Sequence, residues 1–297
     1  MFPYLHEDLN LFNTNDDIFT IKEFQEPLIT ISKTIEKNSR IVKFCKKLEY
    51  YFMKLNWKFS KSCLDVPWEF NTISESGNPL VYVKIQGKNP SHTSVILGGV
   101  HPNEYTPIYL AYRMIFNLKT EDNLVIAPLV NPDGFFKRIP TRTNLHGVDL
   151  NRNFPTLNWD KSRPKAQRYF QGSAPNTEQG TRFQKHLIER FDPKKVISIH
   201  APLGFLDYDG PGDGKGKDSS LEKAKRKAVR RSIKNYRMLR FDVYPGSLGN
   251  YAGRERRIPT FTFELPSSQP QKAFAYWKKF QPYMISLLDL DLNKAED

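Results

Sequence analysis

Residues 93–104 read Thr93-Ser94-Val95-Ile96-Leu97-Gly98-Gly99-Val100-His101-Pro102-Asn103-Glu104. The apolar, partly β-branched residues at the start of this stretch are typical of a buried β-strand, and the two glycines end it. His101 and Glu104 then fall on the loop after the strand, where functional side chains are often placed. An imidazole and a carboxylate at this spacing can bind a metal ion, although the pair alone also fits an ordinary surface loop.

A third ligand and a base follow downstream. Residues 196–200 read Val-Ile-Ser-Ile-His, which places His200 at the mouth of a second strand. His101, Glu104 and His200 would complete a His2Glu zinc site with a fourth position for water. Glu264 ends the apolar segment 258–263, where a carboxylate is costly unless it is paired or functional. Taken alone, Glu264 is best interpreted as a solvent-facing acid on an edge strand. Together with His101, Glu104 and His200, it is best interpreted as a catalytic group.

Several short segments carry a family resemblance. They read His-Pro-Asn-Glu (101–104), Asn-Pro-Asp-Gly (131–134), Gly-Val-Asp-Leu-Asn-Arg-Asn-Phe-Pro (147–155), Ser-Ile-His (198–200) and Phe-Thr-Phe-Glu (261–264). Their order and separations resemble the zinc carboxypeptidase family, the carboxypeptidase A-like metallopeptidases, over roughly residues 78 to 290.

Within that family, Tyr-Pro-Gly-Ser-Leu-Gly-Asn-Tyr-Ala-Gly (244–253) resembles a segment of the bacterial branch that contains the murein tripeptide amidases. Those enzymes cut the bond between γ-D-glutamate and diaminopimelate in cell-wall peptides. The resemblance therefore implies a zinc hydrolase that acts on peptides from peptidoglycan.

The resemblance also implies roles for individual residues. His101, Glu104 and His200 would hold one zinc ion, which lowers the pKa of bound water and polarises the scissile carbonyl. Glu264 would be the general base, and Arg142 would stabilise the oxyanion with a guanidinium that stays charged.

Three further residues would bind substrate. Asn151 and Arg152 would hold the carboxylate of the departing amino acid, Arg152 by paired hydrogen bonds. Tyr251 lies near where the family places a mobile tyrosine that caps the substrate. In a chain this basic, an arginine outside such a context would be taken as a surface residue.

Specificity is open at this point. Arg254, Glu255, Arg256 and Arg257 precede the Glu264 strand, and their charge fits a doubly anionic leaving group such as diaminopimelate. The same residues fit an exposed turn equally well. Arg254 is therefore a candidate substrate-binding residue, and the bond that is cleaved stays undetermined.

Strands and helices alternate along the chain. This order predicts an α/β fold, a single domain with a twisted, mixed, mostly parallel sheet flanked by helices. Residues 78–297 would form the catalytic domain, and residues 1–77 an extension packed on it, with one amphipathic helix over residues 31–61. The expected strands are 80–85, 94–98, 124–129, 196–200 and 259–265, and the expected helices are 106–118, 178–191, 221–236 and 271–288.

Composition fits an ordinary enzyme domain. The chain has 297 residues and a formal net charge of +13, much of it on the segment 223–234. That segment is either a solvated helix face or, less simply, a surface that recruits an anionic wall polymer. We find no zinc finger or other nucleic-acid motif, so we expect no specific nucleic-acid partner. Nothing in the sequence indicates the oligomeric state.

The cellular compartment is predicted from targeting and membrane-spanning segments. No secretory signal or apolar span long enough to cross a bilayer is visible, so we expect no membrane association and a cytoplasmic location, or a periplasmic one if a signal was removed. Cys45 and Cys63 lack metal-type spacing, which favours buried or incidental thiols and leaves a disulfide open.

Two other enzymes and one non-catalytic protein are alternatives to the amidase. A carboxypeptidase that removes another C-terminal residue, or an aspartoacylase-like deacylase of N-acyl amino acids, would share the ligand pattern; residues 131–134 and 261–264 speak against the deacylase. A non-catalytic binding protein is the third hypothesis, and the presence of Glu264 and Arg142 argues against it.

Overall fold

The structure, a computed structural model, describes residues 21–88, 92–161, 168–210, 220–233, 236–239 and 243–292. Contacts divide the chain into two compact units, residues 1–40 and 41–297, and the second holds the sheet, the core and the site. Residues 1–20 of the expected extension lie outside the described part of the chain.

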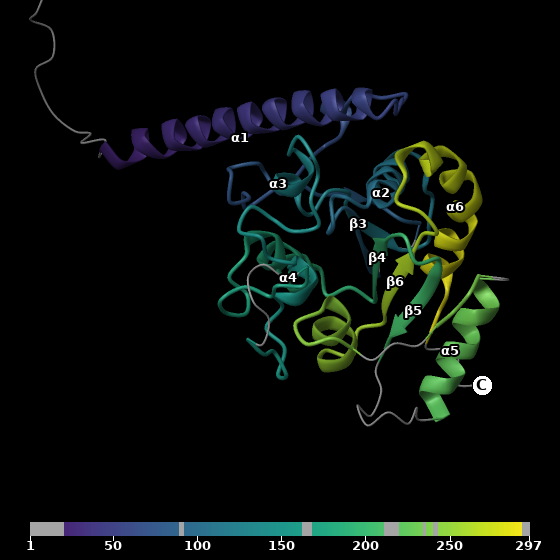
Figure 1. Cartoon of the computed structure of the whole chain (residues 1–297). Helices are drawn as coiled ribbons and strands as arrows, with labels where there is room; N and C mark the ends of the chain where they lie inside the picture. The colour runs from purple at the N-terminus through teal and green to yellow at the C-terminus, as the bar shows by residue number, and fades with distance from the viewer. Residues whose placement is uncertain are drawn as a thin grey trace, which may run out of the picture. The chain divides into compact units, whose positions relative to one another are not determined.

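A mixed sheet forms the centre of the second unit. In the described residues it has six strands in the order β1-β3-β2-β4-β6-β5 (Figure 1). The four inner strands are parallel, whereas β1 and β5 pair antiparallel at the two edges. The strands are β1 Val83–Ile85, β2 Thr93–Leu97, β3 Asn123–Ala127, β4 Lys195–His200, β5 Phe205–Asp209 and β6 Thr260–Glu264.

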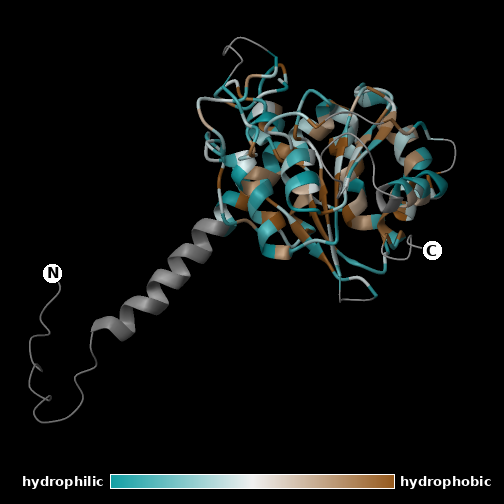
Figure 2. Ribbon diagram, turned by 90° about the horizontal axis from the view of Figure 1, so that it is seen from below, coloured by the Kyte–Doolittle hydropathy of each residue, from teal (hydrophilic) through white to brown (hydrophobic). Residues whose placement is uncertain are grey.

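Helices cover both faces of this sheet. Alternate side chains of each strand point to opposite faces, so Ile96 joins one apolar core while Val95 and Leu97 join the other. α2, α5, α6 and the last turns of α1 contribute to the first core, and α4, η2 and η3 to the second. Figure 2 shows the apolar strands between helices whose outer faces are polar.

The expected fold class is therefore confirmed: the chain has an α/β fold with a mostly parallel sheet between helices.

The described helices are α1 Ile21–Lys54, α2 Tyr105–Asn117, α3 Pro132–Phe135, α4 Gln179–Phe191, α5 Ser220–Ser232 and α6 Ala273–Asp289. Three short 3-10 helices, η1 Cys63–Asp65, η2 Leu150–Arg152 and η4 Pro270–Lys272, and the π-helix η3 Gly249–Glu255 accompany them. None of the described helices combines the length and apolar composition needed to cross a bilayer.

Two elements differ from the sequence-based expectation. The helix expected over 31–61 begins at Ile21 and ends at Lys54. β5, Phe205–Asp209, is not among the expected strands. Its alternation of apolar and acidic residues is nevertheless a strand pattern, with one face in the core and one face toward polar surroundings.

The two cysteines are joined. Cys45 of α1 and Cys63 of η1 form a disulfide with a Cα–Cα distance of 5.3 Å, and both residues are fully buried. The disulfide that the sequence left open is therefore present. It ties the last part of α1 to the segment that leads into the sheet.

Candidate metal centre and substrate pocket

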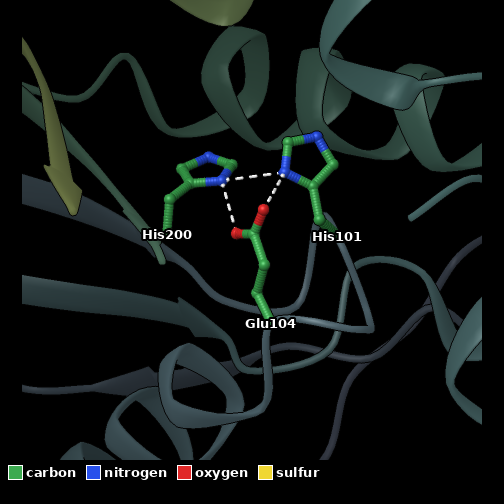
Figure 3. A group of neighbouring side chains, drawn as sticks. All are labelled: His101, Glu104 and His200. Carbon is green, nitrogen blue, oxygen red and sulfur yellow. Dashed lines mark hydrogen bonds and ion pairs between the residues drawn. The ribbon is translucent and has the colours of Figure 1, made fainter. Parts of the chain in front are cut away.

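Two neighbouring strand ends bring three metal-binding side chains together (Figure 3). After β2 the chain turns at Gly99, whose φ of +61° is a conformation that favours glycine, and this turn delivers His101 and Glu104. His200 is the last residue of β4, which pairs parallel with β2. All three residues are buried, with 3%, 6% and 3% of their surface exposed in chain order.

The donor atoms of this triad converge on one point. His101 Nδ1 lies 3.0 Å from His200 Nδ1 and 3.0 Å from Glu104 Oε1, and His200 Nδ1 lies 3.1 Å from Glu104 Oε2. Ligand atoms about 2.0–2.1 Å from a tetrahedral zinc ion would lie about 3.3 Å from one another. The donor types and separations therefore fit a single zinc ion.

The charge state of Glu104 suits a ligand. Burial alone would raise the pKa of its carboxyl, but the adjacent His101 and His200 rings hold that pKa well below its usual range. The Ala201 backbone N–H also donates to Glu104 Oε2, at 3.1 Å. The carboxylate is thus ionised, as a metal ligand must be.

Asp149 orients the triad, a role that sequence reasoning missed. Its fully buried carboxylate accepts hydrogen bonds from His101 Nε2 at 3.0 Å, from Arg142 Nε at 2.9 Å and from the Asn151 backbone N–H at 3.0 Å. Because a carboxylate can only accept, Nε2 of His101 carries the proton and Nδ1 is left to bind metal. Burial acts to raise the pKa of Asp149, but His101 and Arg142 hold it well below its usual range.

A signal for Asp149 was present in the sequence. The residue lies inside the Gly-Val-Asp-Leu-Asn-Arg stretch, two positions before Asn151. A histidine ligand generally needs a partner for its second ring nitrogen, and an acid inside a metal-site motif is the natural candidate.

Glu264 stands at the end of β6, opposite His200 in the strand register. It is 9% exposed, and burial raises the pKa of its carboxyl to about 7. The Leu203 backbone N–H lies 3.4 Å from Glu264 Oε2. A carboxyl of this kind can accept and return a proton near neutral pH.

A pocket of about 430 Å³ joins these groups to Arg142, the expected oxyanion-stabilising residue, and to the expected substrate-binding residues Asn151 and Arg152. Nη1 of Arg142 lies 3.2 Å from Glu104 Oε1, so its guanidinium borders the metal ligands. Asn151 accepts a hydrogen bond from the Leu248 backbone N–H at 2.8 Å, which fixes the direction of its amide.

Aromatic rings position Arg152. Its guanidinium lies 4.6 Å from the Tyr244 ring centroid and 5.4 Å from that of Tyr169, and both tyrosines line the pocket. Gly246, with a φ of +71°, lies against Arg152: a β-carbon there would be 2.1 Å from the Arg152 carbonyl oxygen. The segment 244–249 is thus shaped around this arginine.

The structure does not bring Tyr251 or Arg254 to the pocket. Tyr251 is fully buried in the second core, where its hydroxyl donates to Glu189 Oε1 at 3.1 Å and its ring packs on Phe154. The reason is the phase of η3: Gly249 lines the pocket, and a residue two positions further along a helix points to nearly the opposite side. Tyr169 and Tyr244, which were not among the candidates from the sequence, line the pocket instead.

A separate polar cluster supports the loops around the site. Asp133, in the Asn-Pro-Asp-Gly stretch, accepts hydrogen bonds from Ser74, Ser76 and Asn78, the last at 2.8 Å. Burial acts to raise the pKa of Asp133, but these hydrogen bonds hold it below its usual value. The stretch thus clamps the loop 74–78.

Glu75, His146 and Glu178 form a second group with metal-ligand chemistry. His146 Nδ1 lies 2.8 Å from Glu178 Oε2, and Glu75 accepts from the Gln179 backbone N–H at 2.8 Å. These contacts join two loops to the start of α4, and a structural role accounts for them.

Comparisons with known proteins agree with this geometry. A model of the zinc carboxypeptidase family matches residues 69–284. The chain belongs to the zinc carboxypeptidase family, whose members are hydrolases. The predicted family is therefore confirmed.

The relatives point to one branch of this family. Murein peptide amidase A of Vibrio campbellii is 30% identical over 231 residues, which cover 72% of this chain and 84% of that protein. Murein peptide amidase A of Escherichia coli K12 is 30% identical over 145 residues, 44% of this chain and 57% of that protein. The crystal structure of murein-tripeptide amidase from Escherichia coli O157 matches with a TM-score of 0.55 and 25% identity over 75% of this chain and 92% of that one.

Proposed function

We propose that this protein is a zinc-dependent hydrolase of peptidoglycan-derived peptides that cleaves the bond between γ-D-glutamate and diaminopimelate. The observation that carries the proposal is the convergence of His101, Glu104 and His200 with Glu264 in one pocket. The similarity to murein peptide amidases supports the choice of substrate.

The pocket residues have complementary roles. Zinc, when held by the triad, would lower the pKa of a water molecule and polarise the scissile carbonyl. Glu264 accepts the proton of the attacking water and passes it to the departing amine. Arg142 lies beside the metal ligands, where its guanidinium can stabilise negative charge that develops on the carbonyl oxygen.

The other wall holds the departing amino acid. Arg152 and Asn151 provide donors for its α-carboxylate, and the ring of Tyr244 lies against the Arg152 guanidinium. A substrate with a free carboxylate on the leaving residue therefore fits this pocket, which is compatible with both an amidase and a carboxypeptidase.

Digestion of L-Ala-γ-D-Glu-meso-diaminopimelate, with and without a zinc chelator, tests the proposal by mass spectrometry of the products. Free diaminopimelate whose release is abolished by chelation supports the amidase. Release of D-alanine alone from the corresponding tetrapeptide would make the protein a carboxypeptidase. Intact peptides under all conditions would refute both.

Glu264→Gln tests the base directly. We expect the variant to retain zinc, measured by elemental analysis, and to lose about 10²- to 10⁴-fold in kcat, because a general base typically contributes this much. Glu121→Gln, which changes an exposed carboxylate paired with Lys88, is the matched control. Unchanged turnover in Glu264→Gln would contradict the assigned role.

The disulfide bears on the compartment. A cytoplasmic location is expected from the sequence, with the periplasm as the alternative if a signal was removed. Disulfides persist mainly in oxidising compartments, so the Cys45–Cys63 bond favours the alternative. Cell fractionation with an antibody to the chain distinguishes the two.

A further inference from the structure

A lysine occupies the buried face of α5. Lys225, Val229 and Ile233 follow one another at four-residue intervals, so they lie on one side of the helix. Val229 and Ile233 are fully buried in the first core, and Lys225 is only 8% exposed. The Lys225 side chain forms no hydrogen bond or ion pair with any residue that the structure describes. A buried ammonium group is costly unless an anion compensates its charge.

Lys225 borders a second cavity, of about 220 Å³, that shares no lining residue with the zinc pocket. The cavity lies at the start of β4, whereas His200 is the last residue of that strand, so about 16 Å of strand separates the cavity from the triad. Half of the lining is apolar: Pro193, Ile258, Pro259 and Leu292. The other half is cationic: Lys194, Lys195, Lys225 and Arg257.

Two of these cations are balanced within the protein. Lys194 Nζ lies 3.5 Å from Asp291 Oδ1. Lys195 Nζ donates to backbone carbonyls at the C-terminal end of α6 and lies 3.8 Å from Asp122 Oδ2. Burial lowers the pKa of Lys195 to about 8, a sign that water screens charge poorly here. Poor screening strengthens the attraction of the remaining cations for an anion.

Arg257 is the exposed cation of the cavity and has an uncommon backbone. Its φ of +60° is left-handed, a conformation that favours glycine or asparagine and costs free energy in arginine. Within the described part of the chain its side chain has no hydrogen-bond or ion-pair partner. A strained residue whose charged side chain lines a cavity indicates a ligand-binding role.

We infer that this cavity binds a phosphate group, with Lys225 at its buried end and Arg257 at its exposed end. A guanidinium can donate two parallel hydrogen bonds to phosphate oxygens, and an ammonium group supplies a compact charge. A phosphate group carries between one and two negative charges at neutral pH, which matches two unbalanced cations better than a single carboxylate does. The inference does not depend on the proposed hydrolysis.

The phosphate group belongs either to a small molecule or to an anionic polymer. α5 carries further cations on its exposed surface: Lys223, Lys227, Arg230 and Arg231. These cations would strengthen the binding of a polymer that extends beyond the cavity, but not the binding of a small molecule inside it.

Calorimetric titration of the intact, zinc-loaded protein with inorganic phosphate tests the site. We expect binding by the wild type that is at least about tenfold weaker in Lys225→Gln and in Arg257→Asn, because each removes a charge-assisted contact. Phosphate held by the arginines of the substrate pocket would persist in both variants, so the comparison separates the two places. Equal binding by wild type and variants, or no binding by the wild type at millimolar phosphate, would overturn the inference.

Lys227→Gln is the matched control. It removes the same charge from the same helix, but Lys227 is exposed and lies two residues after Lys225, on nearly the opposite side. It should retain phosphate binding, and a loss equal to that in Lys225→Gln would show diffuse attraction to a basic helix and overturn the site. Arg257→Asn should unfold at the wild-type temperature or above, because asparagine tolerates the left-handed backbone, so its loss of binding cannot be ascribed to misfolding.

A parallel titration with a short polyphosphate chain identifies the source of the phosphate group. Tighter binding of polyphosphate than of phosphate, with the gain lost in Lys227→Gln, supports a polymer that lies along α5. Equal affinity per phosphate group supports a small molecule held in the cavity alone. Binding of polyphosphate that is unchanged in Lys225→Gln and Arg257→Asn would overturn the inference for both sources.

Discussion

Replacement of Asp149 by asparagine should uncouple three parts of the site at once. In the protein, Oδ1 accepts from His101 Nε2 and from the Asn151 backbone, while Oδ2 accepts from Arg142 Nε. Asparagine offers only one carboxamide oxygen. If that oxygen takes the Oδ1 position, the amide NH₂ faces the Arg142 guanidinium, and two donors then oppose each other. If the amide is reversed, His101 and the Asn151 backbone lose their acceptor.

The magnitude follows from these contacts. Partners of metal-binding histidines typically contribute about 10- to 100-fold to metal affinity or activity. This range corresponds to about 1.4–2.8 kcal/mol. We expect zinc affinity and kcat each to be about 10- to 100-fold lower in Asp149→Asn, because His101 loses an ionised partner and the Arg142 guanidinium is no longer held in one direction.

Zinc affinity is measured by competition with a chromophoric chelator, and activity by release of diaminopimelate from the tripeptide. Asp133→Asn is the matched control, since it makes the same charge change at another buried aspartate that does not line the pocket. Zinc affinity and kcat/KM within twofold of the wild-type values in Asp149→Asn would refute the positioning role of this carboxylate.

Other perturbations test the support of the site. Asp133→Asn should lower the free energy of unfolding by about 2 kcal/mol at pH 7, because charge-assisted hydrogen bonds are lost. The pKa of Asp133 is lower in the folded than in the unfolded protein, so the ionised carboxylate stabilises the fold above the unfolded pKa of 3.8, and this stabilisation is lost as the pH falls from there through the folded pKa. Urea titrations at pH 7 and pH 3 should therefore show a smaller difference in unfolding free energy between the variant and the wild type at the lower pH. Gly246→Ala should raise the KM for the tripeptide and leave the zinc content unchanged, because the alanine β-carbon would collide with the Arg152 carbonyl oxygen. An unchanged KM would contradict this. The Cys45–Cys63 bond joins residues that are 18 positions apart, so its reduction should cost about 3 kcal/mol of stability in denaturant titrations, and equal midpoints with and without reductant would contradict this contribution.

Local patterns in the sequence were sufficient to predict the fold and the convergence of His101, Glu104 and His200. The inner strands β2, β3 and β4 are mostly apolar on both faces because the sheet is covered on both sides, so they can be recognised in the sequence as apolar runs. His101 and His200 each follow such a run, and parallel neighbouring strands end at the same edge of a sheet. Convergence of these ligands is therefore a consequence of topology that the sequence order already implies.

Other features depend on geometry that no local pattern encodes. Tyr251 lies two residues after Gly249, and only the phase of η3 decides which of the two faces the pocket. β5 was overlooked because a strand at the rim of a polar cavity carries acids where a core strand carries apolar residues. Tyr251 and β5 both lie at or beside the pocket wall, where residue types are determined by contact with a ligand rather than by packing in the core.

The pocket combines residues from two kinds of position in the sheet. The groups assigned to hydrolysis, His101, Glu104, His200 and Glu264, lie at strand ends, where the backbone fixes their positions to suit one zinc ion and one base. Other residues of the pocket wall, Asp207 and Asp209 among them, lie along a strand, where a side chain can change without disturbing the hydrogen bonds between strands. A change of side chain along β5 should therefore leave the sheet and the triad in place, whereas a change of backbone at the end of β2 or β4 should displace the triad itself.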